Sequence, residues 1–219
     1  MTRLRHWLRA WGMAVVGIGA LSVAAAAQAR LPGSFANLRV VGRLVTFAVE
    51  SGRPVLSLNE AAGQGLVWLS DSSFATGTLE VTVRGQDVVG RSFVGIAFAG
   101  RNDSTYEAVY LRPFNFNRAD STRHAHAIQY IAQPAYPWER LRAERTGVFE
   151  QPLRRRADPN AWTLLRLVIT ADSVFGFVNG GAAPDLAVAR LAPGAVGRTG
   201  YWVGDGSGGT FRGLIGSTP

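Results

Sequence analysis

Apolar and polar residues alternate along most of the chain, in short runs that end at glycine, asparagine, aspartate or proline. A period of two places successive side chains on opposite faces of a β-strand, and frequent turn residues favour antiparallel hairpins. The pattern predicts twelve strands: Leu38–Val49, Val55–Asn59, Gly65–Leu69, Gly77–Gln86, Ser92–Ala99, Thr105–Arg112, Ala125–Ala132, Trp162–Thr170, Ser173–Val178, Asp185–Arg190, Gly197–Val203 and Thr210–Ile215. The one helical pattern, Pro137–Arg145, is too short to be a stable helix by itself.

Strands in this number bury their apolar faces either as two packed sheets or as a closed barrel. Residues 30–219 form one segment without an internal repeat, which is enough chain for a single core and too little for two ordinary domains. The segment is much longer than an immunoglobulin domain of about 100 residues. We therefore predict an all-β fold, a single two-sheet antiparallel jelly-roll sandwich over residues 30–219.

Residues 1–29 have the pattern of a secretory signal peptide. A basic stretch, TRLRHWLR, precedes an apolar run, and Ala27-Gln28-Ala29 matches the small-x-small cleavage pattern. We predict cleavage after Ala29 and export to the periplasm or the extracellular space. The alternative is an uncleaved membrane anchor, because Trp11–Ala27 is just long enough to span a thinned bilayer. The alanine and glycine content of this run favours cleavage, after which we expect no membrane association.

Charge and cysteine content exclude several classes of function. All 23 basic residues are arginine, and three of them lie in the predicted signal peptide, which leaves 20 against 15 acidic residues. This modest excess predicts no nucleic-acid partner, and we expect a monomer. The chain has no cysteine, which excludes disulfides, a thiol nucleophile and a cysteine-ligated metal. His124 and His126 could face the same side of a strand, but without a third ligand we predict neither a metal nor a cofactor.

Alternation along the sixth predicted strand separates its side chains into two faces. The odd-numbered positions, among them Glu107, are expected to face the core. The even-numbered positions, which include Tyr110 and Arg112, make an aromatic and hydrogen-bonding face. On the neighbouring strand the residues of that same face are small, Gly95 and Ala97. Small residues beside a Tyr/Arg row would leave space above the sheet for a ligand.

Sugar rings carry hydroxyls at their edges and C–H groups on their faces, so saccharide sites combine an aromatic platform with arginine, amide or carboxylate groups. An arginine offers a rigid fork of donors, and an amide offers both a donor and an acceptor. The candidate ligand-binding residues are Tyr110, Arg112, Asn115, Gln129, Tyr130, Trp138 and Arg142. The alternative is that the aromatic rings fill a second layer of the core and that Arg112 only braces a loop.

A series of motifs carries a family resemblance: GRSFVGIAF, YEAVYLRPFNF, IQYIAQPAYPWERLR, VFE, WTLLRLVI, FVNG and GYWVGDGSGGTFR. In this order the series resembles the concanavalin A-like jelly roll of the laminin-G-like and 3-keto-disaccharide hydrolase-like exported bacterial domains, over residues 35–215. The resemblance implies a concave sheet that receives saccharide, either to hydrolyse a modified disaccharide or only to hold a glycan. The two most specific motifs of the series, YEAVYLRPFNF and IQYIAQPAYPWERLR, contain all seven candidate ligand-binding residues.

The carboxylates bear on the choice between enzyme and binding domain. Glycosidases usually place two acids about 5 to 9 Å apart across the scissile bond, and no predicted strand offers two acids on one face at i, i+2 or i+4 spacing. The candidate acids are Glu107, Glu139 and Glu150, although Glu139 could instead pair with a neighbouring arginine on a solvated turn. We therefore predict an exported saccharide-recognising domain. If it is an enzyme, it would hydrolyse a glycosidic bond in a modified keto disaccharide; the alternative is a non-catalytic laminin-G-like binding or adhesion domain.

Overall fold

The computed structural model describes residues 37–69 and 72–217. The predicted signal peptide, residues 1–29, lies outside the described residues, so its cleavage and the export of the protein stay predictions. In the described part of the chain, no helix has the length and apolar character needed to cross a membrane.

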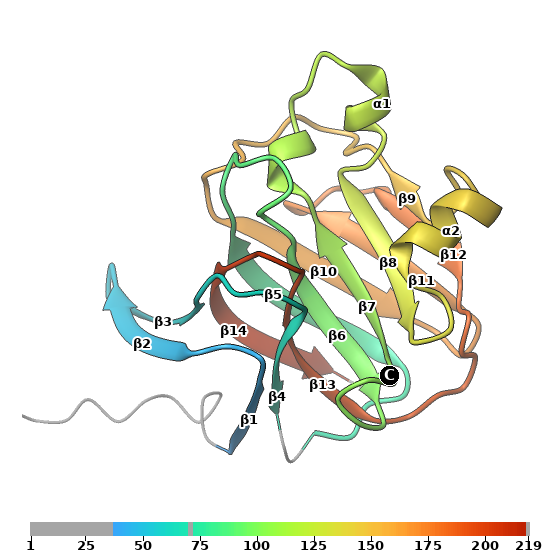
Figure 1. Ribbon diagram of the computed structural model, residues 1–219. Coiled ribbons are helices and arrows are strands. Elements are labelled where there is room, and N and C mark those ends of the chain that lie inside the picture. Colours follow the sequence, from blue (N-terminus) through green and yellow to red (C-terminus); the bar gives the residue numbers. More distant parts are fainter. Residues whose placement is uncertain (1–36, 70–71, 218–219) are drawn as a thin grey trace, which may run out of the picture. The chain divides into compact units, whose positions relative to one another are not determined.

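The described residues form fourteen strands in two sheets of seven, and every pairing among these strands is antiparallel (Figure 1). The first sheet has the order β1 (Leu38–Val41), β4 (Gly65–Leu69), β13 (Arg198–Val203), β6 (Val94–Gly100), β7 (Tyr106–Leu111), β8 (Ile128–Gln133) and β9 (Glu150–Gln151). The second has the order β12 (Leu186–Ala189), β11 (Ser173–Val178), β10 (Thr163–Ile169), β5 (Gly77–Arg84), β14 (Gly209–Ser217), β3 (Arg53–Leu58) and β2 (Val45–Glu50). The predicted all-β jelly-roll sandwich is confirmed.

Helical segments are short and lie between strands of the first sheet. They are η2 (Pro113–Asn115), α1 (Ser121–His124) and α2 (Trp138–Glu144). The helix α2 lies within the predicted helical stretch and packs beside β8 (Figure 1). The strand predicted to start at Ala125 starts only at Ile128, because Asp120 caps α1 through a bond from Thr122 N to its carboxylate and the chain stays helical to His124.

The predicted strand Leu38–Val49 was wrong as a single element, because it is two strands that belong to different sheets. The chain turns at Gly42, whose φ of +66° suits glycine, and at Arg43. Arg43 is buried, and its guanidinium donates to main-chain carbonyls that include those of Gly63 and Gly204, at 2.7 and 2.8 Å. These hydrogen bonds to residues distant in the sequence fix the turn at which the chain passes from the first sheet to the second.

The two sheets differ in how their outer sides are covered. In β5, β10 and β11 buried residues alternate with half-buried ones, as expected for a sheet with one face on the core and one toward solvent. In β6 and β7 every residue is buried, and in β8 all but the last. Other side chains therefore cover the outer face of the first sheet, the face that points away from the second sheet.

A buried ion pair lies between the sheets. Arg190, which follows β12, donates from Nη2 to Glu107 Oε1 at 2.6 Å, and both side chains are buried. The hydroxyl of Tyr130 donates to Glu107 Oε2 at 2.5 Å. Glu107 thus faces the core, as the alternation predicted, and this position separates it from the outer face. Tyr130, also a predicted ligand-binding residue, lies on this core side of β8, because strand neighbours point to opposite sides and Gln129 takes the outer one.

Candidate functional site

Aromatic side chains form a layer on the outer face of the first sheet. Tyr110 stacks on Trp202 with ring centroids 4.5 Å apart, and Trp68 meets Tyr106 edge to face at 5.7 Å. The Trp202 Nε1 donates to the Tyr106 hydroxyl at 3.2 Å. Burial raises the pKa of Tyr106 and of Tyr110 to about 12. The phenols of this layer are therefore neutral at physiological pH.

The space expected above Gly95 is filled in part by Tyr110, because a Cβ on Gly95 would lie 2.7 Å from the Cβ of Tyr110. Two further glycines of the first sheet lie against Trp68. A Cβ on Gly100 would lie 2.6 Å from the ring of Trp68, and a Cβ on Gly200 would lie 3.0 Å from the same ring. The small residues of β6 and β13 therefore make room for a tryptophan of the protein. The space for a ligand is displaced toward α2 and the loop that precedes β6.

Two adjoining hollows mark that space. The central hollow, of about 310 Å³, is lined by residues that include Gln64, Glu139, Trp202 and Asp205. The basic hollow, of about 250 Å³, is lined by residues that include Arg112, Asn115, Arg123, His126 and Arg142. Gly90, Phe93 and Trp138 line both, and we call the two hollows together the groove.

Larger hollows beside the second sheet offer less suitable chemistry. One of about 580 Å³ lies by Arg84, Asn160 and Thr210, and one of about 430 Å³ lies by Thr76 and Thr170. Neither is lined by an aromatic side chain. The groove combines exposed aromatic surface with charged and amide groups, and this combination makes it the candidate site.

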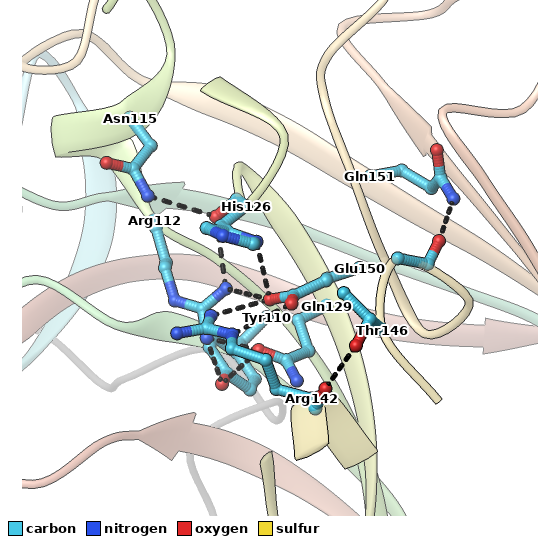
Figure 2. A network of polar contacts seen from close by, with 10 residues as sticks. Tyr110, Arg112, Asn115, His126, Gln129, Arg142, Thr146, Glu150 and Gln151 are labelled. Carbon is cyan, nitrogen blue, oxygen red and sulfur yellow. Dashed lines mark hydrogen bonds and ion pairs between the residues drawn. The ribbon is translucent and has the colours of Figure 1, made fainter. Parts of the chain in front are cut away.

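The floor of the basic hollow is organised around the carboxylate of Glu150 (Figure 2). Arg142, from α2, donates through Nε to Oε1 at 2.9 Å and through Nη2 to Oε2 at 2.6 Å. Arg112, which follows β7, donates from Nη1 to Oε2 at 3.3 Å, and His126 Nδ1 lies 2.9 Å from the same oxygen. One buried carboxylate thus joins β9, α2 and the ends of β7 and β8.

Charges around Glu150 determine its ionisation and that of His126. Burial alone would raise the pKa of Glu150, but the hydrogen bonds and charge of Arg142, with the charges of Arg112 and His126, outweigh burial and hold that pKa below its usual value. Burial lowers the pKa of His126; the two arginines add to this effect and the Glu150 carboxylate opposes it. At neutral pH the carboxylate is therefore ionised and the imidazole neutral.

A second set of hydrogen bonds lies beneath this carboxylate. Arg112 Nη2 donates to the Tyr110 hydroxyl at 3.0 Å and to Gln129 Oε1, and the Tyr110 hydroxyl donates to the same Oε1 at 3.0 Å. Asn115 Nδ2 donates to the main-chain oxygen of His126 at 3.2 Å. Tyr110 and Gln129 are completely buried, so they support the groove from below and do not line it.

The structure brings six of the seven predicted ligand-binding residues to one place and excludes Tyr130. Trp138, with 38% of its surface exposed, and Arg142, whose guanidinium lies 4.7 Å from the Trp138 ring, are in the wall of the groove. Of the candidate acids, Glu139 lines the central hollow, Glu150 lies under the basic hollow, and Glu107 is between the sheets.

Sequence reasoning did not select several side chains that line the groove, among them Phe93, His126, Trp202 and Asp205. Alternation along Arg198–Val203 contains the signal for Trp202, because Tyr201 packs on Phe211 of the other sheet and its neighbour must face outward. His124 and His126 do not share a strand, since His124 ends α1. Among the described residues no three His, Asp or Glu side chains are grouped so as to hold a metal ion.

Comparisons with known proteins bear on the fold. No protein-family model and no curated protein matches the chain. A carbohydrate binding module, CBM66, from Bacillus subtilis superposes with a TM-score of 0.52 at 15% identity, covering 82% of this chain and 98% of that one. A Bacillus subtilis protein of unknown function with a galectin-like fold gives a TM-score of 0.52 at 12% identity, covering 81% and 87%. The chain therefore has a galectin-like, concanavalin A-like jelly-roll fold, while membership of the 3-keto-disaccharide hydrolase-like group is not confirmed.

Proposed function

We propose that this domain binds saccharide in the groove, with the Trp138 ring as the stacking platform. One observation carries the proposal: an exposed tryptophan lies where the two hollows join, and each hollow supplies hydrogen-bonding side chains around it. A sugar needs this pairing, because its C–H faces stack on an aromatic ring while its hydroxyls seek polar partners. The similar fold of a module named as carbohydrate binding supports the same assignment.

The platform is held in position before any ligand binds. Leu141 anchors α2 in the core, and Arg142 ties the helix to the buried Glu150. The guanidinium of Arg142 also lies over the Trp138 ring. A ring that is already ordered loses little conformational entropy on binding, and this favours affinity for a small ligand. In this proposal the partner is a carbohydrate met outside the cytoplasm after export, and the protein acts as a monomer.

A glycan array followed by calorimetry on the purified protein tests this function. Trp138→Ala should weaken binding of any array hit by at least tenfold, about 1.4 kcal/mol, because the stacking surface is removed. The matched control is Phe47→Ala, a ring on β2 of the second sheet with a similar exposure of 41%. Unchanged affinity of Trp138→Ala for a hit, or an array without hits, would refute saccharide binding in the groove.

Glycosidic hydrolysis is a second candidate, favoured by two carboxylates at the central hollow. Glu139 and Asp205 both line it, beside Trp202. Glu107 lies between the sheets and Glu150 is held by two arginines, so neither is placed to exchange a proton with a ligand in the groove. In this reading Glu139 and Asp205 supply the acid and base for cleaving a modified keto disaccharide.

Turnover assays separate hydrolysis from binding and from adhesion. If hydrolysis occurs, Glu139→Gln and Asp205→Asn should abolish release of reducing sugar from a keto disaccharide while calorimetric binding persists. If the unmodified protein binds the sugar but does not hydrolyse it, the protein is a binding domain and not a glycosidase. Binding of neither sugar nor keto disaccharide would favour the laminin-G-like adhesion alternative.

A further inference from the structure

The two halves of the groove carry opposite charge. The central hollow is lined by the acids Glu139 and Asp205 and by no arginine. The basic hollow is lined by three arginines, one histidine and one asparagine, and by no carboxylate. Trp138 lies in the wall that the two hollows share. A ligand stacked on this ring therefore meets positive charge on one side only.

The carboxylate under the basic hollow does not neutralise it. Glu150 is a single negative charge and pairs with two guanidinium groups, of Arg112 and Arg142. Arg123 lies 3.8 Å from Asp120, and both of these side chains are 55% exposed, so solvent screens that pair. His126, whose pKa is lowered mainly by burial, adds no charge at neutral pH. One positive charge in this hollow thus remains without a matching negative charge.

The free donor next to the Trp138 ring belongs to Arg142. Its Nε and Nη2 are used by Glu150, while its Nη1 has no hydrogen-bond partner among the described residues. The side chain is 34% exposed and lies over the Trp138 ring, so the free edge of the guanidinium is available beside the stacking surface. An arginine held rigid on one side by a buried carboxylate and open on the other is suited to bind a planar oxyanion.

We propose that the basic hollow binds the carboxylate of an acidic saccharide, a uronic acid residue whose ring stacks on Trp138. The carboxylate accepts from Arg142 Nη1 and completes the charge balance of the hollow, while hydroxyls of the same or the next sugar bind in the central hollow at Glu139 and Asp205. This inference rests on the proposed saccharide binding and names its ligand class.

The test compares oligouronates with their methyl esters, which have the same rings and linkages without the charge. Oligomers of galacturonate, glucuronate and mannuronate are titrated into the full chain by calorimetry, each against its ester. The acid form should bind about tenfold more tightly than the ester, as expected for a charge-assisted hydrogen bond. The preference should fall as salt is added. Sulfated neutral oligosaccharides form a third arm, and tighter binding of these than of any uronate would overturn the carboxylate assignment.

Variants identify the side chain that causes the preference for the acid form over the methyl ester. Arg142→Met should abolish it, while Arg142→Lys, which keeps the charge and loses the fork, should retain part of it. The matched control is Arg140→Met on the same helix, an exposed arginine that pairs with Glu144 away from the groove. If acid and ester bind equally to the unmodified protein, or if only neutral sugars bind, the inference fails although saccharide binding stands. If no saccharide binds, the proposed function itself fails.

Discussion

Removing one charge of the Glu107–Arg190 pair should destabilise the domain more than any change to a surface pair. Glu107→Gln keeps the volume and removes the negative charge, which leaves the buried guanidinium of Arg190 without a counter-charge. Breaking a buried ion pair costs about 3–5 kcal/mol. Arg190 keeps its bonds to three main-chain carbonyls, at 3.0 to 3.3 Å, so the lower end of the range applies. We expect a loss of about 3 kcal/mol in the free energy of unfolding.

Thermal and urea unfolding by circular dichroism measure this loss. For a domain of this size 1 kcal/mol corresponds to about 2–4 °C, so the melting temperature should fall by roughly 6–12 °C. The matched control is Glu144→Gln, which breaks the exposed i,i+4 pair with Arg140 and should change the free energy by less than about 0.5 kcal/mol.

The double variant Glu107→Leu with Arg190→Met removes both charges and should recover part of the loss, since no unpaired charge is left between the sheets. Equal melting temperatures for Glu107→Gln and Glu144→Gln would refute the placement of Glu107 in a low-dielectric core. That result would also return Glu107 to the candidate acids.

Two further predictions concern the groove and the layer beneath it. The pKa values of Glu150 and His126 are both lower in the folded state, so the unfolded state binds more protons below about pH 6.5. The free energy of unfolding should therefore fall on acidification. This fall should be smaller in Glu150→Gln, which lacks one of the two groups. Urea unfolding at pH 7 and pH 4 checks the sign, and constant stability would contradict it. Gly100→Ala should cost about 1–3 kcal/mol through a clash with Trp68, and a double-mutant cycle with Trp68→Phe should show coupling. Additive losses would exclude the clash.

The alternation of residues along the strands contained information about the site that the sequence-based prediction left out. Gln129 and Tyr130 are strand neighbours, so one of them had to face the core, and the alternation that correctly placed Glu107 was sufficient to separate them. The same alternation could have selected Trp202. Glu150 is different, because its partners Arg112 and Arg142 come from other elements and its strand has only two residues. A two-residue strand has no periodicity from which a face can be predicted.

The split of the predicted strand Leu38–Val49 shows a similar limit. Gly42 is a local signal for a turn, but the carbonyls that bind the Arg43 guanidinium belong in part to residues more than 160 positions away. Local patterns contain no information on such partners, so a continuous strand was the natural prediction.

By itself the sequence determined the fold class, most strands and the inward position of Glu107, because period-two alternation is a local property that burial of one face enforces. The tertiary structure alone decided that Trp68 lies against Gly100 and Gly200, that Tyr110 and Gln129 support the groove without lining it, and that Trp138 is an exposed ring of the groove. It also decided that two arginines share one carboxylate. These outcomes depend on which loop and helix cover the outer face, and that covering follows from contacts between residues far apart in the chain.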